Sequence, residues 1–343
     1  VRAKIENIPI VLSSATPSLE TKINVRSGKY KEVVLPDRFG SAVLPAVDLI
    51  DMRRFPPEKK EGIKSFLSPV LIKEIEETLE RKEQTLLFLN RRGYAPLVLC
   101  RQCGHRFQCP NCSAWLVEHK NGRRLECHHC GYHIPVPEKC PVCDSEGELT
   151  SCGPGVERIS EEISVLFPKA KQLVVSGDLN ATAAQMADLM RQIHDHEVDV
   201  IIGTQILTKG HHFPDLTLVG VVDADLGLIG GDLRAGERTF QMLHQVSGRA
   251  GRADKKGKVF LQTFDPENQI MQALKTGNAD RFFAAEIQAR ELLKMPPFGR
   301  LAGIVVSSPS QEYAQKAASL LGRCAPQADG VRVLGPTPAG WVF

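Results

Sequence analysis

The sequence predicts an α/β fold with a doubly wound parallel sheet, interrupted by a cysteine-rich insertion that binds metal. Three observations support this prediction. Short apolar runs of strand length alternate with amphipathic helical patterns. Polar segments that contain glycine follow several of these runs directly. Four CxxC pairs lie between Cys100 and Cys143.

The composition is that of an ordinary globular protein. A chain of 343 residues is long enough for two or three domains with a well-buried core. The net charge of +3 is too small to indicate a nucleic-acid partner, so any basic surface must be local. No apolar run approaches the roughly 18 residues that a membrane span needs, and no membrane partner is expected. The first residues do not resemble a signal peptide, and the chain begins with Val, which fits a fragment.

The strands and helices of the sheet follow from the hydrophobic pattern. Five short apolar runs predict buried parallel strands at residues 85–90, 171–175, 198–202, 216–222 and 258–264. Amphipathic patterns predict helices between some of them. One helix, at 69–82, places Val70, Ile75 and Leu79 near one face, and a second follows at 155–167.

Polar segments follow three of these strands where they end. They are "NRRGY" at 90–94, "GTQILTKGHHF" at 203–213 and "DADLGL" at 223–228. Ligands of doubly wound sheets bind beyond the carboxyl ends of the strands. Each segment alone could be a connecting loop. Together they predict a rim that binds phosphate or a nucleic-acid backbone.

The cysteine pairs predict zinc. Each CxxC turn directs two thiolates at one ion, and tetrahedral zinc needs two such turns. The absence of a secretory signal favours metal over disulfides, while redox chemistry and an iron–sulfur centre are the alternatives. The four pairs provide ligands for two ions: Cys100 and Cys103, Cys109 and Cys112, Cys127 and Cys130, Cys140 and Cys143.

The spacing favours nested pairing of these turns. Five residues between Cys103 and Cys109 leave little chain for a reversal, whereas fourteen between Cys112 and Cys127 allow a hairpin. The outer site then combines the first and last pairs and the inner site the two middle pairs. Interleaved pairing is the alternative. No cysteine is left for an open coordination position, which indicates structural zinc. His128 and His129 are interpreted as surface or second-sphere groups.

Aromatic and arginine side chains offer two further candidate contacts. Phe107, Trp115 and Tyr132 could stack on bases or form the core of the small metal domain. The segment "LHQVSGRAGRA" at 243–253 places Arg249 and Arg252 around glycines. It is either a helix end closed by glycine or a phosphate clamp.

Several segments resemble the motifs of superfamily 2 helicases. "VLSSATPSLE" at 11–20 resembles motif III, and "LFLNRRGYAP" at 87–96 resembles motif IV. "IIGTQILTKGHHFPDLTLVGVVDAD" at 201–225 resembles motif V, and "QVSGRAGRA" at 245–253 resembles motif VI. An eight-cysteine insertion in the second helicase lobe is similar to that of the PriA family, the bacterial primosomal helicases.

The resemblance implies the domain organisation. A RecA-like second lobe would carry the zinc domain as an insertion and be followed by a small α+β domain. "QEYAQKAASLLGR" at 311–323 is the expected helix of that last domain, which the resemblance implies to be truncated. The implied boundaries are 1–50 for the end of the first lobe and the linker, 51–99 and 144–290 for the second lobe, 100–143 for the zinc domain, and 291–343 for the C-terminal domain.

The resemblance also implies the nucleotide contacts. Arg249 and Arg252 would face the triphosphate bound in the other lobe, with Arg252 as the arginine finger, because arginine stabilises the charge of the transferring phosphoryl group. Gln245 would be positioned around the same phosphates, and Gly210 would lie close to the nucleotide.

The remaining implied contacts are with DNA. Thr204, Lys209 and Arg91 would hold the DNA backbone, a contact without base specificity. Ser14 and Thr16 would couple the nucleotide state to the DNA groove.

The function implied is that of an ATP-dependent 3′-to-5′ DNA helicase that recognises stalled forks and promotes primosome assembly and replication restart. The cofactors would be two structural Zn²⁺ ions and, in the full-length protein, ATP with Mg²⁺. No G-x-x-x-x-G-K-[ST] or DExH segment occurs, so this chain alone is expected to be inactive. The expected partners are forked and single-stranded DNA, primosome proteins and single-stranded-DNA-binding protein. The protein is expected to be a monomer. It is expected in the bacterial cytoplasm, in association with the nucleoid. The alternatives are a RecG-like translocase and a non-catalytic zinc-ribbon nucleic-acid-binding protein.

Overall fold

The computed structural model describes most of the chain. The described residues are 2–35, 45–58, 65–89, 97–110, 116–119, 124–126, 132–147, 149–152, 156–175, 182–204, 213–228, 234–251, 255–304, 306, 308, 310–326, 328–333 and 335–336.

The chain divides into two compact units. Val1–Arg38 and Asn278–Ala302 form the first, and Phe39–Gly277 and Gly303–Phe343 form the second. The helices of the first unit are α1 (Arg2–Ile5), α2 (Leu19–Arg26) and α8 (Ala279–Leu292). Lys22 joins α2 to α8, because its Nζ lies 3.2 Å from Asp280 Oδ1 and 4.6 Å from the ring centre of Phe283.

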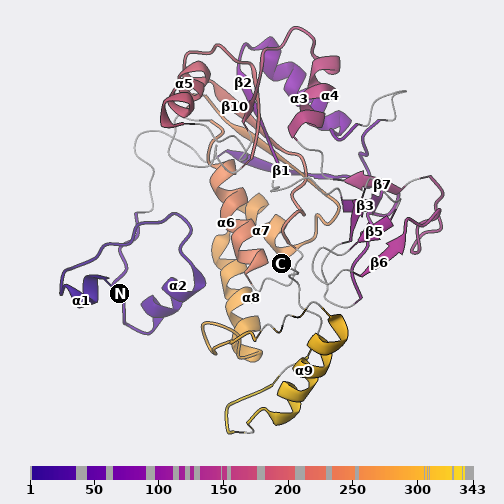
Figure 1. The fold of residues 1–343 in the computed structure, drawn as a ribbon. Coiled ribbons are helices and arrows are strands. Elements are labelled where there is room, and N and C mark those ends of the chain that lie inside the picture. Colours follow the sequence, from indigo (N-terminus) through magenta and orange to yellow (C-terminus); the bar gives the residue numbers. More distant parts are fainter. Residues whose placement is uncertain are drawn as a thin grey trace. The chain divides into compact units, whose positions relative to one another are not determined.

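A parallel sheet forms the centre of the second unit (Figure 1). Within the described ranges it has six strands in the order β1-β11-β10-β2-β9-β8, and every neighbouring pair is parallel. The five predicted strands are all present. The strands are β1 (Ala46–Asp51), β2 (Gln84–Phe88), β8 (Gln172–Val175), β9 (Val200–Gly203), β10 (Leu216–Val221) and β11 (Lys258–Thr263).

Strand β1 is the one element of this sheet that the hydrophobic runs do not predict. It lies at the edge and pairs with β11 from Ala46↔Lys258 to Asp51↔Thr263. The boundary predicted at residue 50, between the linker and the second lobe, therefore falls inside a strand.

Helices cover both faces of the sheet. The predicted helices are present as α3 (Pro69–Glu80) and α4 (Val156–Leu166). Ser68 begins α3, because its Oγ accepts a hydrogen bond from the Leu71 N–H. Helices α3 and α4 contact strands β2, β10, β8 and β9, while α7 (Gln269–Thr276) contacts β1 and packs on α6 (Ala235–Ser247). The remaining helix of this layered part is α5 (Ala183–His194).

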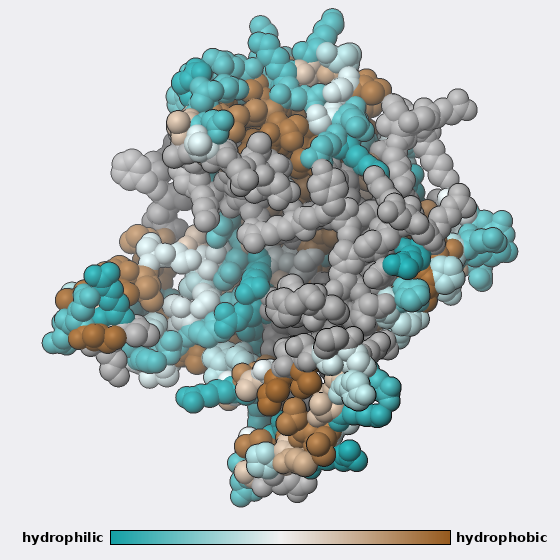
Figure 2. Space-filling model, viewed as in Figure 1, coloured by the Kyte–Doolittle hydropathy of each residue, from teal (hydrophilic) through white to brown (hydrophobic). Residues whose placement is uncertain are grey.

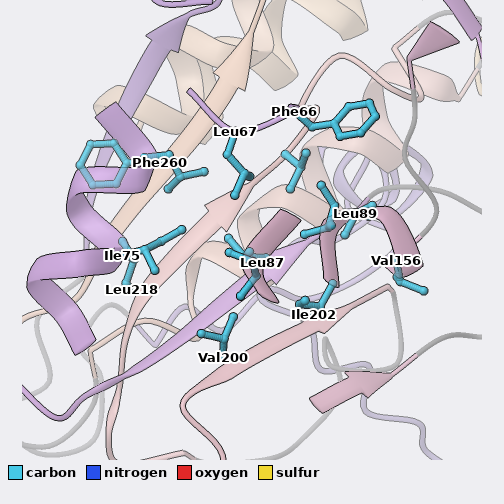
Figure 3. Packing of buried hydrophobic residues seen from close by; sticks show 14 of the residues in the cluster. Phe66, Leu67, Ile75, Leu87, Leu89, Val156, Val200, Ile202, Leu218 and Phe260 are labelled. Carbon is cyan, nitrogen blue, oxygen red and sulfur yellow. The ribbon is translucent and has the colours of Figure 1, made fainter. Parts of the chain in front are cut away.

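The main core lies between the sheet and the α3 and α4 helices (Figure 3). Alternate residues of neighbouring strands point into it, as the two-residue period of a strand requires. Gly220 of β10 belongs to this interface, since a Cβ there would lie 2.9 Å from Leu71 of α3. The labelled side chains include Leu87, Leu89, Val200, Ile202, Leu218 and Phe260.

The cysteine-rich segment forms a second, antiparallel sheet. Its described strands follow the order β6-β5-β4-β3-β7. The first and last strands along the chain, β3 and β7, pair directly from Leu97↔Cys152 to Cys100↔Leu149. The strands are β3 (Leu97–Cys100), β4 (Val117–His119), β5 (Arg124–Glu126), β6 (His133–Pro135) and β7 (Leu149–Cys152).

This segment has a small core of its own. Val98, Phe107, Cys109, Leu116 and Leu125 are buried in it, with Tyr132 packed against them. The ring of Phe107 therefore belongs to the core, in agreement with the structural interpretation of these rings. Trp115 lies outside the described residues.

The helix predicted at 311–323 is present as α9 (Gln311–Cys324). Figure 2 shows a hydrophobic area over this helix. Tyr313, Leu320 and Leu321 are exposed on it. In the described part of the chain, no helix combines the length and apolar character required to cross a bilayer.

Candidate metal centre at the rim of the sheet

Four cysteines meet beside the parallel sheet. The Sγ atoms of Cys100, Cys103, Cys140 and Cys143 all lie within 4.8 Å of one another. The Cys100–Cys143 and Cys103–Cys140 sulfur pairs are each 3.6 Å apart. These four residues are the outer quartet of the nested pairing.

Two copies of one turn hold these thiols. In the first, the Cys100 N–H donates to the His105 carbonyl at 2.8 Å, and the Gly104 N–H donates back to Cys100 at 2.8 Å. In the second, the Cys140 N–H donates to Ser145 at 3.0 Å, and the Asp144 N–H donates to Cys140 at 2.9 Å. The residue after the second cysteine has a positive φ in both turns, 78° at Gly104 and 54° at Asp144.

The cluster fits a tetrahedral zinc ion. Four thiolates at the usual Zn–S distance of about 2.3 Å lie about 3.8 Å from one another, close to the two measured spacings. The four thiols are thus positioned to bind zinc. Of the predicted inner quartet, Cys109 is described and is 2% exposed. Its predicted partners Cys112, Cys127 and Cys130 lie outside the described residues.

The environment of the thiols differs between the two turns. Hydrogen bonding with Ser145 lowers the pKa of the Cys143 thiol to about 6. Burial raises the pKa of the Cys103 thiol to about 12. Because zinc binds thiolates, protons compete with the metal at this cluster, and occupancy decreases in acid.

The first turn lies against the carboxyl ends of β10 and β11. Arg106 Nη2 contacts Asp225 Oδ2 at 3.0 Å and Asp223 Oδ1 at 3.3 Å, and the guanidinium carbon lies 5.8 Å from the ring centre of Phe264. Arg106 is 7% exposed and Asp225 is 6% exposed. Burial raises the pKa of Asp225 to about 6, an effect that the charge of Arg106 opposes. No sequence motif predicts this ion pair.

The turn after helix α6 lies at the opposite end of the sheet. Gly251 has a φ of 63°, and its N–H donates to the carbonyl of Leu216, the first residue of β10. A Cβ on Gly251 would lie 2.0 Å from the Gly257 nitrogen, just before β11. Arg249 is buried in this turn, and Gln245 is exposed in the last turn of α6. The described part of the arginine segment, residues 243–251, is thus not part of the carboxyl rim.

The other predicted contact residues lie in separate places. Thr204 follows β9 at the carboxyl rim and is half-buried, and its N–H donates to Val175 at 3.2 Å. Ser14 and Thr16 belong to the first unit, where the Thr16 N–H donates to Ser14 Oγ at 3.1 Å. Thr16 is buried and Ser14 is exposed. The predicted residues Arg91, Lys209, Gly210 and Arg252 lie outside the described residues.

Three family models match separate parts of the chain. Residues 109–135 match the PriA DNA helicase Cys-rich region domain, and residues 291–341 match the primosomal protein N C-terminal domain. Residues 155–254 match the helicase conserved C-terminal domain. The parallel sheet, the cysteine cluster and these matches define the class of the protein: a helicase C-terminal domain that carries a zinc-ribbon insertion.

Curated relatives identify the family. The chain is 51% identical over 336 residues to replication restart protein PriA of Rickettsia prowazekii, covering 98% of this chain and 51% of the relative. It is 40% identical over 306 residues to replication restart protein PriA of Bacillus subtilis, covering 89% of this chain and 38% of the relative. The chain belongs to the PriA family, and it spans about half the length of these relatives or less.

Solved helicase structures also resemble the chain. Saccharomyces cerevisiae Dbp5 bound to RNA and ADP BeF3 is 12% identical, with a TM-score of 0.40, over 85% of this chain and 57% of Dbp5. The helicase domain of Pyrococcus furiosus Hef is 13% identical, with a TM-score of 0.26, over 56% of this chain and 24% of Hef.

Proposed function

We propose that this chain forms the second motor lobe, the zinc module and part of the C-terminal domain of an ATP-dependent 3′-to-5′ DNA helicase. In this proposal the full-length protein recognises stalled replication forks and promotes primosome assembly and replication restart. The observation that carries the proposal is the 51% identity to a replication restart protein across 98% of the chain.

The motor contacts belong to the region that matches the helicase family. Thr204, Gly210, Gln245, Arg249 and Arg252 all fall within residues 155–254. In the proposal, Arg252 stabilises the charge of the transferring phosphoryl group, and Arg249 and Gln245 hold the same phosphates. Gly210 leaves space for the nucleotide. ATP with Mg²⁺ is bound mainly by the other lobe, because this chain has no phosphate-binding G-x-x-x-x-G-K-[ST] loop.

The DNA contacts are proposed for the loops that follow the strands. Thr204, Lys209 and Arg91 hold the backbone of forked or single-stranded DNA, and Ser14 and Thr16 couple nucleotide state to that groove. Primosome proteins and single-stranded-DNA-binding protein are the proposed protein partners. The protein is proposed to act as a monomer in the bacterial cytoplasm, in association with the nucleoid.

The metal module is proposed to hold two structural Zn²⁺ ions. Cys100, Cys103, Cys140 and Cys143 would hold one ion. The second would be held by Cys109, Cys112, Cys127 and Cys130. Zinc in such closed sites supplies folding free energy to a segment with a small core.

Substitution of the proposed arginine finger tests this function. In the full-length protein, Arg252→Ala should lower DNA-stimulated ATP turnover by about 10³-fold, because one positive charge is lost from the transition state. Nucleotide affinity should change less. Arg238→Ala, at an exposed position of helix α6, is the matched control.

Turnover by Arg252→Ala within about threefold of the wild type would contradict the proposed role. The 343-residue chain alone should not hydrolyse ATP with or without DNA. DNA-stimulated hydrolysis by this chain that exceeds that of its Lys209→Ala/Arg252→Ala variant would also contradict the proposal.

A further inference from the structure

The loop at 223–228 brings two carboxylates together at the carboxyl rim. Asp223 Oδ1 accepts hydrogen bonds from the N–H groups of Asp225 and Leu226, both at 3.1 Å. Asp225 Oδ2 accepts from the Phe264 N–H at 2.8 Å, and its Oδ1 accepts from the Thr263 hydroxyl. The carboxylates thus fix the loop to the end of β11, but they are close like charges with little solvent.

Arg106 supplies the positive charge that this pair needs. In the described part of the chain it is the cation with which both carboxylates form ion pairs. The nearby Arg53 is instead paired with Asp51 at 2.9 Å and is largely solvated. Removal of one member of a buried ion pair is strongly unfavourable, because the remaining charge loses both water and its partner.

The metal turn determines where Arg106 lies. Arg106 follows Cys103 by three residues, and it forms a bridge with Leu99, the residue before Cys100. Further contacts fix the same turn on the lobe. A Cβ at Gly104 would lie 3.0 Å from Phe264 Cδ1, and Arg101 Nη2 donates to the Ser65 carbonyl at 3.1 Å.

We propose that Arg106 is a positioning residue through which the outer metal site orders the 223–228 loop of the motor lobe. Metal at the four cysteines holds the turn, the turn holds Arg106, and Arg106 neutralises the carboxylates that fix the loop. The metal therefore acts beyond the fold of its own module. This inference does not require the proposed helicase activity.

Amide hydrogen exchange of the zinc-loaded 343-residue chain tests the inference. Cys140→Ser/Cys143→Ser removes the half of the outer site that does not carry Arg106. Loss of this zinc should increase exchange at the amides of Asp225, Leu226 and Phe264 by at least about tenfold. In an Arg106→Ala background the same amides should already exchange fast, and the cysteine substitutions should add less than about twofold.

Replacement of both Arg106 and Asp225 by neutral residues tests whether Arg106 acts through its charge. Asp225→Asn keeps an oxygen that can accept from the Phe264 N–H but removes one of the two negative charges. Arg106→Met/Asp225→Asn should therefore return the loop amides to within about threefold of wild-type exchange, unlike Arg106→Ala. Lys139→Ala, which breaks the exposed Lys139–Glu146 pair of the second turn, is the matched control and should leave the loop unchanged.

The amides of β11 show whether the sheet remains folded in each variant. If β11 also loses protection in the cysteine variant, Arg106→Ala with zinc bound decides the question: fast loop exchange supports the inference and unchanged exchange overturns it. Loop exchange that is insensitive to zinc in the wild type, or equally sensitive in both backgrounds, also overturns it. Zinc content, measured in every sample, separates loss of metal from loss of Arg106.

Discussion

At the residue scale, the conformation and surroundings of Gly251 explain why the arginine segment has a glycine at this position. Its φ of 63° lies in the left-handed region, and a Cβ there would lie 2.0 Å from the Gly257 nitrogen. Backbone of the neighbouring chain segment fills the space that a side chain needs. The helix itself ends earlier, at Gly248, whose φ of −65° does not require glycine.

Gly251→Ala should lower the free energy of unfolding by at least about 2 kcal/mol, because it combines backbone strain with overpacking. Gly277 is the matched control, since it has a φ of 66° but no atom within 4 Å of its Cβ position. Gly277→Ala should cost only about 1 kcal/mol. Urea denaturation measures both changes, and equal losses would show that the close contact with Gly257 is unimportant.

Asp225 should make the stability of the parallel-sheet lobe depend on pH. Burial raises the pKa of this carboxyl from 3.8 to about 6, although Arg106 opposes the shift and Asp223 adds to it. The folded state therefore binds the proton more tightly than the unfolded state. The contribution of Asp225 to stability is most favourable below pH 4 and decreases as the pH rises through 6.

Asp225→Asn should remove this dependence. The free energy of unfolding of the variant minus that of the wild type should increase between pH 4 and pH 6, by about 2 kcal/mol. Denaturant titrations of both proteins at each pH measure the difference, and effects of zinc loss that both share cancel. A difference that stays constant over this interval would contradict the raised pKa.

At the scale of the elements, substitution of one CxxC turn tests the nested pairing of the cysteines. The described turns at Cys100 and Cys140 face one another, which leaves the two middle pairs to form the second site. Cys109→Ser/Cys112→Ser should therefore lower the bound zinc from two ions to one. Cys140 and Cys143 should remain protected from alkylation, because their partners are unchanged.

Metal analysis and mass spectrometry after alkylation measure both outcomes. Cys324→Ser, at an exposed position of helix α9, is the control and should keep two zinc ions. Alkylation of Cys140 and Cys143 in the Cys109→Ser/Cys112→Ser variant would indicate interleaved pairing instead.

The hydrophobic pattern predicts every strand of the sheet except β1, at one of its two edges. The four inner strands have continuous apolar runs because both of their faces are covered, and the edge strand β8 keeps a short apolar run although it is only partly buried. Strand β1 is not predicted, because Asp48 and Asp51 interrupt the apolar run of "AVDLID" and the strand is only partly buried. The start of helix α5 is marked in the sequence by the capping box between Thr182 and Gln185.

At the scale of the whole molecule, long-range contacts limited what the sequence could predict. The spacing of the cysteines predicted which four would meet, because short turns restrict the geometry. Arg106 and Asp225 are 119 residues apart and belong to no shared motif. The position of the Gly251 turn, at the end of the sheet opposite to the 223–228 loop, likewise depends on the direction of α6 across the sheet. Neither the ion pair nor the position of this turn can be predicted from a short stretch of sequence.

The pairing of β3 with β7 also bears on how such a protein can arise. These strands are where the cysteine-rich segment leaves and rejoins the lobe, and Leu97 lies directly opposite Cys152. Directly opposed residues of antiparallel strands are only about 5 Å apart. A gene for the lobe can therefore gain or lose the whole segment in one event without altering the register of the parallel strands. After such a gain, the carboxylates of the lobe and Arg106 of the inserted segment depend on one another. Later loss of the segment would leave the buried carboxylates without their ion-pair partner and would destabilise the lobe.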